Sequence, residues 1–305
     1  MSLEVMTRLG IGTSILSCAI PTSVVTKDAA EEAALSREIN EYLASLRDQH
    51  PSQFGFFATV PSLSEDVQGC IDEIRYAYST LKADGVALFT SYSDKYLGHP
   101  AFEPVWAELN SHVAVVFIHP TMESNDKAIK EPFLIPRALF DWSHEVTRTA
   151  MHLIMTGAVR RFSACKVILS HGGGTLPFVA NRIADVPIQT RLSGKTPAEF
   201  IQDARSFYFD TALVGHKAPL RLLMSFAQRG HVLWGSDYPF VREDPLVQKS
   251  QTIDAVEVGA WERAGMEDEG NEEIDRDRGL TLPVVTRQAA QALFPRFADP
   301  DLPVG

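Results

Sequence analysis

Short apolar runs recur along the chain, and segments with a helical spacing of apolar residues separate most of them. The runs cover residues 10–20, 54–60, 85–91, 113–119, 166–171, 207–212 and 231–237, and helical patterns cover 29–50, 62–83, 144–162, 219–229 and 281–294. The runs lack period-two alternation, so each predicted strand is buried on both faces. Such strands, separated by amphipathic helices, predict an α/β fold with a parallel sheet. An open doubly wound sheet and a closed barrel both satisfy this pattern.

Polar residues at the ends of the predicted strands distinguish these two folds. His119, His171, Asp210 and Asp237 all stand at or near such ends. A (β/α)8 barrel assembles its active site from the loops after all of its strands, whereas an open sheet concentrates it at one switch point. No G-x-G-x-x-G fingerprint follows the first run, which argues against a dinucleotide site. We therefore predict a TIM-like (β/α)8 barrel.

The charge and the cysteines restrict the partners and the compartment. The 305 residues carry a formal net charge of −11, which argues against nucleic acid or an anionic membrane as a partner. We find no apolar run of the roughly 18 residues that a membrane span needs. The three cysteines are far apart and odd in number, which is typical of reduced thiols and predicts a cytoplasmic protein.

Two imidazoles and a carboxylate form the candidate site. If the barrel closes, His119, His171 and Asp237 project into one mouth. These side chains suit a divalent metal such as zinc, which lowers the pKa of bound water and polarises oxygen ligands, and they also suit acid/base chemistry.

Three motifs carry a resemblance to a known family. The sequences FIHP (117–120), SHGGGTLPFVANRI (170–183) and WGSDYPF (234–240) resemble signatures of the decarboxylase branch of the amidohydrolase superfamily. That branch includes the aminocarboxymuconate semialdehyde, γ-resorcylate and 6-methylsalicylate decarboxylases. The resemblance implies one metal-dependent hydrolase-like barrel domain over residues 1–305, holding one divalent metal, zinc or manganese, and forming a homodimer.

The resemblance also assigns roles to particular residues. His119 and Asp237 match metal ligands, and His171 matches a catalytic histidine; Asp237 shares the catalytic role. Arg182 resembles an arginine that contacts the substrate carboxylate, a task that suits the planar guanidinium fork. We expect the glycines at 172–174 to keep the mouth free of side chains, so that a substrate ring lies close to the imidazole.

One departure from the family pattern concerns the first strand. Family members begin with an H-x-H or E-x-H metal pair, and nothing before Leu9 resembles it. We therefore expect a barrel without its first strand, unpaired edges at the first and last runs, and weak or absent metal binding. Two explanations stay open: the sequence begins at an internal methionine of a longer protein, which we favour, or the chain is a degenerate relative.

The expected reaction is the non-oxidative removal of CO2 from a small aromatic or enolic carboxylic acid, as in a carboxy-lyase. Asp237 or His171 would deliver the proton to the ring carbon. Two alternatives remain. The same scaffold supports metal-dependent hydrolysis of amides or lactones, and the missing first strand favours a catalytically inactive relative.

Overall fold

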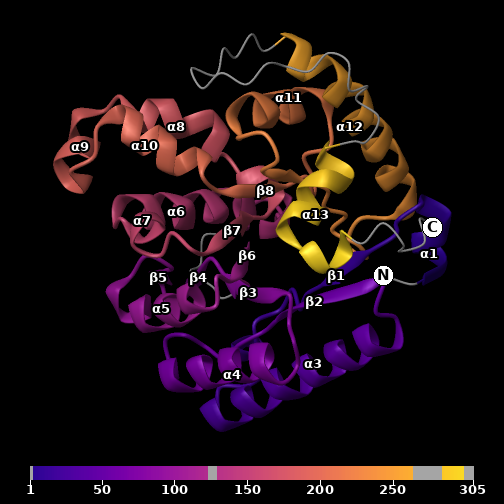
Figure 1. The fold of residues 1–305 in the computed structure, drawn as a ribbon. Helices are drawn as coiled ribbons and strands as arrows, with labels where there is room; N and C mark the ends of the chain where they lie inside the picture. The colour runs from indigo at the N-terminus through magenta and orange to yellow at the C-terminus, as the bar shows by residue number, and fades with distance from the viewer. Residues whose placement is uncertain (1–2, 123–128, 264–283, 299–305) are drawn as a thin grey trace.

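Seven parallel strands form the central sheet of the computed structural model, which describes residues 3–122, 129–263 and 284–298. The sheet curls into a half-barrel with helices packed around it (Figure 1). In spatial order the strands are β1 (Ser14–Leu16), β2 (Phe54–Ala58), β3 (Gly85–Phe89), β6 (Val115–His119), β7 (Lys166–Leu169), β8 (Tyr208–Asp210) and β9 (Val232–Leu233). The α/β fold with seven barrel-type strands is therefore confirmed.

The first and last strands are shorter than predicted. The run at 10–20 forms a strand only over β1, because Gly10 has a left-handed backbone (φ 66°) where helix α1 (Leu3–Leu9) ends. The run at 231–237 pairs only over β9, and the chain then turns through Asp237, whose φ is 56°. Left-handed residues do not fit a strand, so Gly10 and Asp237 lie outside the sheet.

Helices fill the intervals between the strands. Helix α3 (Ala29–Gln49) matches the prediction closely, because Asp28 caps it by accepting the N–H groups of Ala30 and Glu31 at 3.0 Å. Helix α4 (Val67–Ser79) begins later than the predicted residue 62, since its cap is Asp66. The other predicted helices correspond to α6 (Asp141–Met155), α7 (Ala158–Arg161), α11 (Lys217–Phe226) and α13 (Ala289–Leu293). Residues 281–283 of the last prediction lie outside the described residues.

Several helices were not predicted. They are α1, α2 (Thr22–Val25), α5 (Glu103–Ser111), α8 (Leu176–Ala184), α9 (Pro187–Ser193), α10 (Pro197–Arg205) and α12 (Glu243–Arg263). Helices α8 to α10 follow one another between β7 and β8 and project from the body of the molecule (Figure 1). A short hairpin of β4 (Ser91–Tyr92) and β5 (Lys95–Tyr96) also extends beyond the end of β3.

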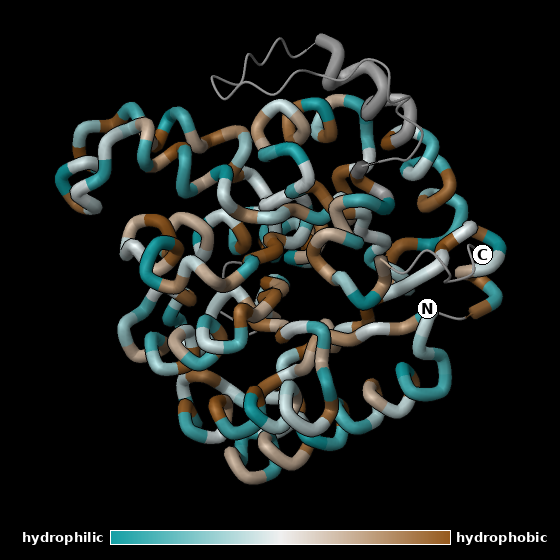
Figure 2. The backbone as a smooth tube through the Cα atoms, viewed as in Figure 1, coloured by the Kyte–Doolittle hydropathy of each residue, from teal (hydrophilic) through white to brown (hydrophobic). Residues whose placement is uncertain are grey.

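Both faces of the sheet are buried. Alternate strand residues pack outward against the helices, as Val116 and Ile118 do, while Val115 and Ala87 pack on the inner face. Hydrophobic residues accordingly follow the strands through the interior, and hydrophilic residues lie mainly on the outer helices (Figure 2). Burial on both faces explains why the strands lack period-two alternation.

The C-terminal segment covers the inner face. Phe294 and Phe297 pack against the inner side chains of the strands, and α13 lies in front of the sheet (Figure 1). Arg296 donates to the carbonyl oxygens of Pro51 and Phe54 and pairs with Asp84. Among the described residues β1 and β9 are the two end strands of the sheet, as predicted for the runs at 10–20 and 231–237. Beyond β9, the N–H of Trp234 donates to the carbonyl of Val285 at 3.1 Å.

Within residues 3–122, 129–263 and 284–298, none of the helices combines the length and the apolar character that crossing a bilayer requires.

Candidate active site

The site lies at the rim, which we define as the edge of the sheet at the carboxyl ends of the strands. His119 is the last residue of β6, and His171 follows the neighbouring strand β7 by two residues. Their rings lie 5.8 Å apart between centroids. Asp237 stands four residues after β9, at the same edge. The structure thus brings the two predicted histidines together and puts the predicted aspartate on the rim with them.

The His119 ring is buried and its orientation is set. Its Nδ1 lies 3.0 Å from the carbonyl oxygen of Pro120, and a carbonyl only accepts, so Nδ1 carries the proton and Nε2 keeps its lone pair. Burial lowers the pKa of His119 to about 4, which keeps the imidazole neutral at neutral pH. Rings of Phe89, Phe117 and Trp142 lie 5.7 to 6.4 Å from it. A neutral imidazole with a free Nε2 is the form that binds a metal.

His171 is equally buried, and a left-handed backbone presents it at the rim. Its φ is 55°, and Gly172, Gly173 and Gly174 continue with φ between 63° and 72°. Burial, and to a lesser extent His119, lowers its pKa to about 3. Asp237 also has a left-handed φ, of 56°. Residues other than glycine rarely adopt this conformation, and such strain concentrates at functional sites.

The three glycines after His171 do not keep the mouth open, which corrects the prediction. A Cβ on Gly173 would lie 2.7 Å from the ring of Phe209, and one on Gly174 would lie 1.9 Å from the carbonyl oxygen of Ser143. A Cβ on Gly172 would lie 3.0 Å from the side chain of Val214. The glycines therefore allow a left-handed loop to pack closely against the protein itself.

Asp210 holds this loop in place, a role that the sequence did not reveal. Its Oδ1 accepts the N–H groups of His171 at 2.7 Å and Ala212 at 3.0 Å. Burial raises its pKa to about 7, with a smaller contribution from the charge of Asp237, while the backbone N–H groups oppose the shift. The only signal in the sequence was its position at the end of a strand.

The charges of Asp237 and Lys249 interact. Burial raises the pKa of the Asp237 carboxyl, and the nearby Lys249 ammonium opposes that shift. Lys249 lies on α12 and is only 8% exposed, and burial lowers its pKa while Asp237 raises it. Nothing in the sequence singled out this lysine.

Arg182 lies near the end of α8 and is exposed. Its guanidinium makes no hydrogen bond or ion pair with any residue in the part of the chain that the structure describes. The structure therefore does not bring it into contact with His119, His171 or Asp237.

The described residues supply an incomplete set of metal ligands. His119 offers Nε2 and Asp237 offers a carboxylate, but no group of three or more His, Cys, Asp or Glu side chains with the arrangement of a metal site occurs among the described residues. A catalytic zinc normally takes three protein ligands. These two residues alone do not make a complete site.

Comparisons with known proteins agree with this architecture. The family model described as amidohydrolase matches residues 19–266. A 6-methylsalicylic acid decarboxylase of Penicillium expansum is 42% identical over 258 residues, which are 84% of this chain and 79% of that protein. Another 6-methylsalicylic acid decarboxylase, from Aspergillus aculeatus, is 42% identical over 300 residues, covering 96% of this chain and 85% of the relative.

A solved structure shows the same fold. A dihydroxybenzoic acid decarboxylase from Polaromonas, determined with bound manganese and an inhibitor, superposes with a TM-score of 0.74. The match covers 98% of this chain and 86% of that one at 20% identity, so the likeness concerns the fold.

Proposed function

The chain belongs to the amidohydrolase family, and from that premise we propose that it is a non-oxidative decarboxylase of a small aromatic carboxylic acid of the 6-methylsalicylate type. The observation that carries the proposal is the identity of 42% to two proteins named for that activity, over most of this chain and of both relatives. The two buried histidines and the aspartate at the rim are consistent with it, because this reaction needs a dry pocket and a group that moves a proton.

The proposed reaction exchanges CO2 for a proton at one ring carbon. A proton reaches the carbon that bears the carboxylate, the bond to the carboxylate breaks, and its electron pair restores the conjugation of the ring. At neutral pH His171 is neutral, because burial lowers its pKa to about 3. Burial instead raises the pKa of Asp237, so its carboxyl is the more readily protonated of the two groups. We assign proton delivery to Asp237 and a hydrogen bond to the substrate to His171.

The proposal includes one divalent metal, zinc or manganese. Its support is the family and the manganese in a structural neighbour. His119 and Asp237 are the donors that the described residues would contribute, and a bound metal would polarise substrate oxygens.

We also assign a homodimer to this protein. Large apolar side chains are exposed on and beside α8 and α9, which project from the body: Phe178 is 77% exposed, Leu192 70% and Ile188 56%. Apolar side chains gathered on a projecting element mark an interaction surface. Light scattering coupled to gel filtration measures the mass in solution directly, and a monomer at micromolar concentration would contradict this assignment.

Turnover of 6-methylsalicylate tests the decarboxylase proposal. The purified chain is incubated with the acid and with added manganese or zinc, and CO2 and 3-methylphenol are quantified. We expect both products in equal amounts. We expect Asp237→Asn and His171→Asn to lower kcat by about 100-fold or more. His112→Asn, between α5 and β6 and away from the rim, serves as the matched histidine control.

A lactone substrate distinguishes decarboxylation from the alternative reaction, hydrolysis. An aromatic lactone is offered under the same conditions, and ring opening without release of CO2 from the acid would assign hydrolysis instead. No turnover of either substrate with either metal would show that this chain is not an active decarboxylase.

A further inference from the structure

A decarboxylase site for an aromatic acid must hold an anion, yet apart from a bound metal no cationic side chain has been placed at this rim. His119 and His171 are buried imidazoles, and Asp210 and Asp237 add carboxyl groups to the same rim. The whole chain carries a net charge of −11, which does not attract an anion either. The substrate carboxylate therefore requires a local cation.

Lys249 is the buried cation at this rim. Two lysines, Lys195 and Lys249, are less than one-tenth exposed among the described residues. Lys195 forms an ion pair with Asp203 at 3.2 Å, away from the rim. Lys249 makes no hydrogen bond or ion pair with a described residue, and only the longer-range attraction of Asp237 acts on it. A buried ammonium without a directly bonded anion is costly, so this position favours an anion that contacts it directly.

The fold holds the Lys249 stem in place. Its Cβ and Cγ pack against Gly215, in the loop after β8, so closely that a Cβ on that glycine would lie 2.8 Å from both atoms. Gly215 thus allows α12 to approach the rim, and the lysine stem crosses from α12 to the loops that follow β8 and β9. The Lys249 side chain is only 8% exposed, and its ammonium lies near enough to Asp237 for the two charges to interact.

We propose that the Lys249 ammonium binds the carboxylate of the aromatic acid. This inference rests on the proposed function for the identity of the acid, and it assigns the anion-binding role to a buried residue of the rim. A cation on the carboxylate stabilises the bound acid, but it does not stabilise the CO2 that forms from it. Loss of Lys249 therefore raises KM and does not lower kcat.

Binding of two matched probes tests this role without requiring turnover. Salicylate carries the carboxylate, and 3-methylphenol lacks it, so calorimetric titration of both isolates the contribution of the anion. We expect Lys249→Met to weaken salicylate binding by about tenfold or more, and 3-methylphenol binding by less than about twofold. Lys249→Arg, which keeps the charge, should retain salicylate binding within about fivefold. Lys217→Met, an exposed lysine on α11, is the control.

Two results would overturn the proposal. Unchanged salicylate binding in Lys249→Met would show that the ammonium does not contact the carboxylate, and equal losses for both probes would show that Lys249 only maintains the shape of the site. If Lys249→Met does not fold, Gly215→Ala displaces the stem instead, and selective loss of salicylate binding is again expected. Since binding is measured without CO2 release, an inactive wild-type chain whose salicylate affinity depends on Lys249 would refute the decarboxylase proposal alone.

Discussion

At the scale of single residues, the loop after β7 is defined by backbone conformation. Four consecutive residues from His171 to Gly174 are left-handed, and Asp210 accepts the N–H at the start of this turn. Only glycine adopts this conformation without a steric cost. His171 bears that cost, so its imidazole is presented in a geometry that the surrounding packing enforces.

Gly174 and Gly194 both have positive φ but differ in ψ and in packing. Gly194 is in the left-handed helical region (φ 70°, ψ 7°) and nothing lies within 4 Å of a Cβ there, whereas Gly174 has φ 64° and ψ −122°, and a Cβ on it would lie 1.9 Å from the Ser143 carbonyl oxygen. We expect Gly194→Ala to lower the free energy of unfolding by about 1 kcal/mol and Gly174→Ala by about 3 kcal/mol or more. Urea unfolding measures both. Equal losses would show that the contact at Gly174 relaxes freely.

Asp210 makes stability depend on pH in a defined window. Its pKa is about 7 in the folded protein and near the ordinary 3.8 when unfolded. A raised pKa means that its contribution to stability is fully present below pH 3.8 and is lost as the pH rises through about 7. Asp210→Asn keeps the Oδ1 acceptor but cannot ionise.

We therefore expect the metal-free wild type to lose a few kcal/mol of stability, relative to Asp210→Asn, between about pH 4.5 and about pH 8. Urea unfolding of both proteins at the two pH values makes the comparison, and the titrating groups that do not interact with Asp210 cancel. Parallel losses in the two proteins would contradict the assignment.

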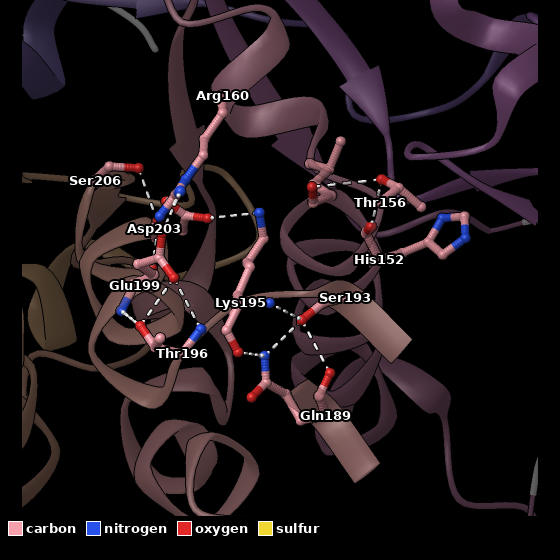
Figure 3. Close-up of polar contacts among 11 residues, drawn as sticks. His152, Thr156, Arg160, Gln189, Ser193, Lys195, Thr196, Glu199, Asp203 and Ser206 are labelled. Carbon is pink, nitrogen blue, oxygen red and sulfur yellow. Dashed lines mark hydrogen bonds and ion pairs between the residues drawn. The ribbon is translucent and has the colours of Figure 1, made fainter. Parts of the chain in front are cut away.

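At the scale of elements, a polar cluster fastens the projecting helices to the body. Asp203 on α10 lies between Arg160 of α7, whose Nε donates to it at 2.8 Å, and Lys195, whose ammonium lies 3.2 Å away (Figure 3). The side chain of Thr196 caps α10 through a reciprocal bond with Glu199. Both Lys195 and Asp203 are buried, so the cluster depends on their pairing.

Removing the anion from this cluster should cost more than removing one of its cations. Asp203→Ala leaves Lys195 buried without its partner, and we expect a loss of about 3 kcal/mol in the free energy of unfolding. Lys195→Met leaves Asp203 paired with Arg160 and should cost less. Glu103→Gln removes an ion pair between half-exposed side chains and should cost at most about 0.5 kcal/mol. Denaturant unfolding ranks the three variants by their loss in the free energy of unfolding. A larger loss for Lys195→Met than for Asp203→Ala would contradict the role assigned to Asp203.

At the scale of the whole molecule, the half-barrel has an inner face that a complete barrel would close over. Here Phe294 and Phe297 cover that face, and Arg296 connects the covering segment to the carbonyl groups of Pro51 and Phe54. The N–H after β9 finds a partner in the same C-terminal region, at Val285. The C-terminal segment thus buries apolar surface that the open arrangement exposes.

Metal content tests whether the residues at the rim form a complete metal-binding site. Because the described residues supply two donors, we expect less than about half an equivalent of zinc or manganese per chain after prolonged dialysis, by elemental analysis. His119→Ala should reduce metal uptake further when the ion is added back. A full equivalent retained by the wild type and lost in His119→Ala would show that the rim binds metal tightly as it stands. Retention in both proteins would place the metal elsewhere.

Three features could be predicted from the sequence: the alternation of strands and helices, the parallel sheet, and the convergence of His119 and His171. Each follows from local patterns, because apolar spacing sets the elements and neighbouring parallel strands bring their last residues to one edge. The hydrogen bond of Asp210 to the His171 loop, the inward packing of the glycines and the interaction of Lys249 with Asp237 depend on the folded arrangement. These depend on contacts between segments far apart in the chain, and no local pattern of residues records which distant atoms will meet.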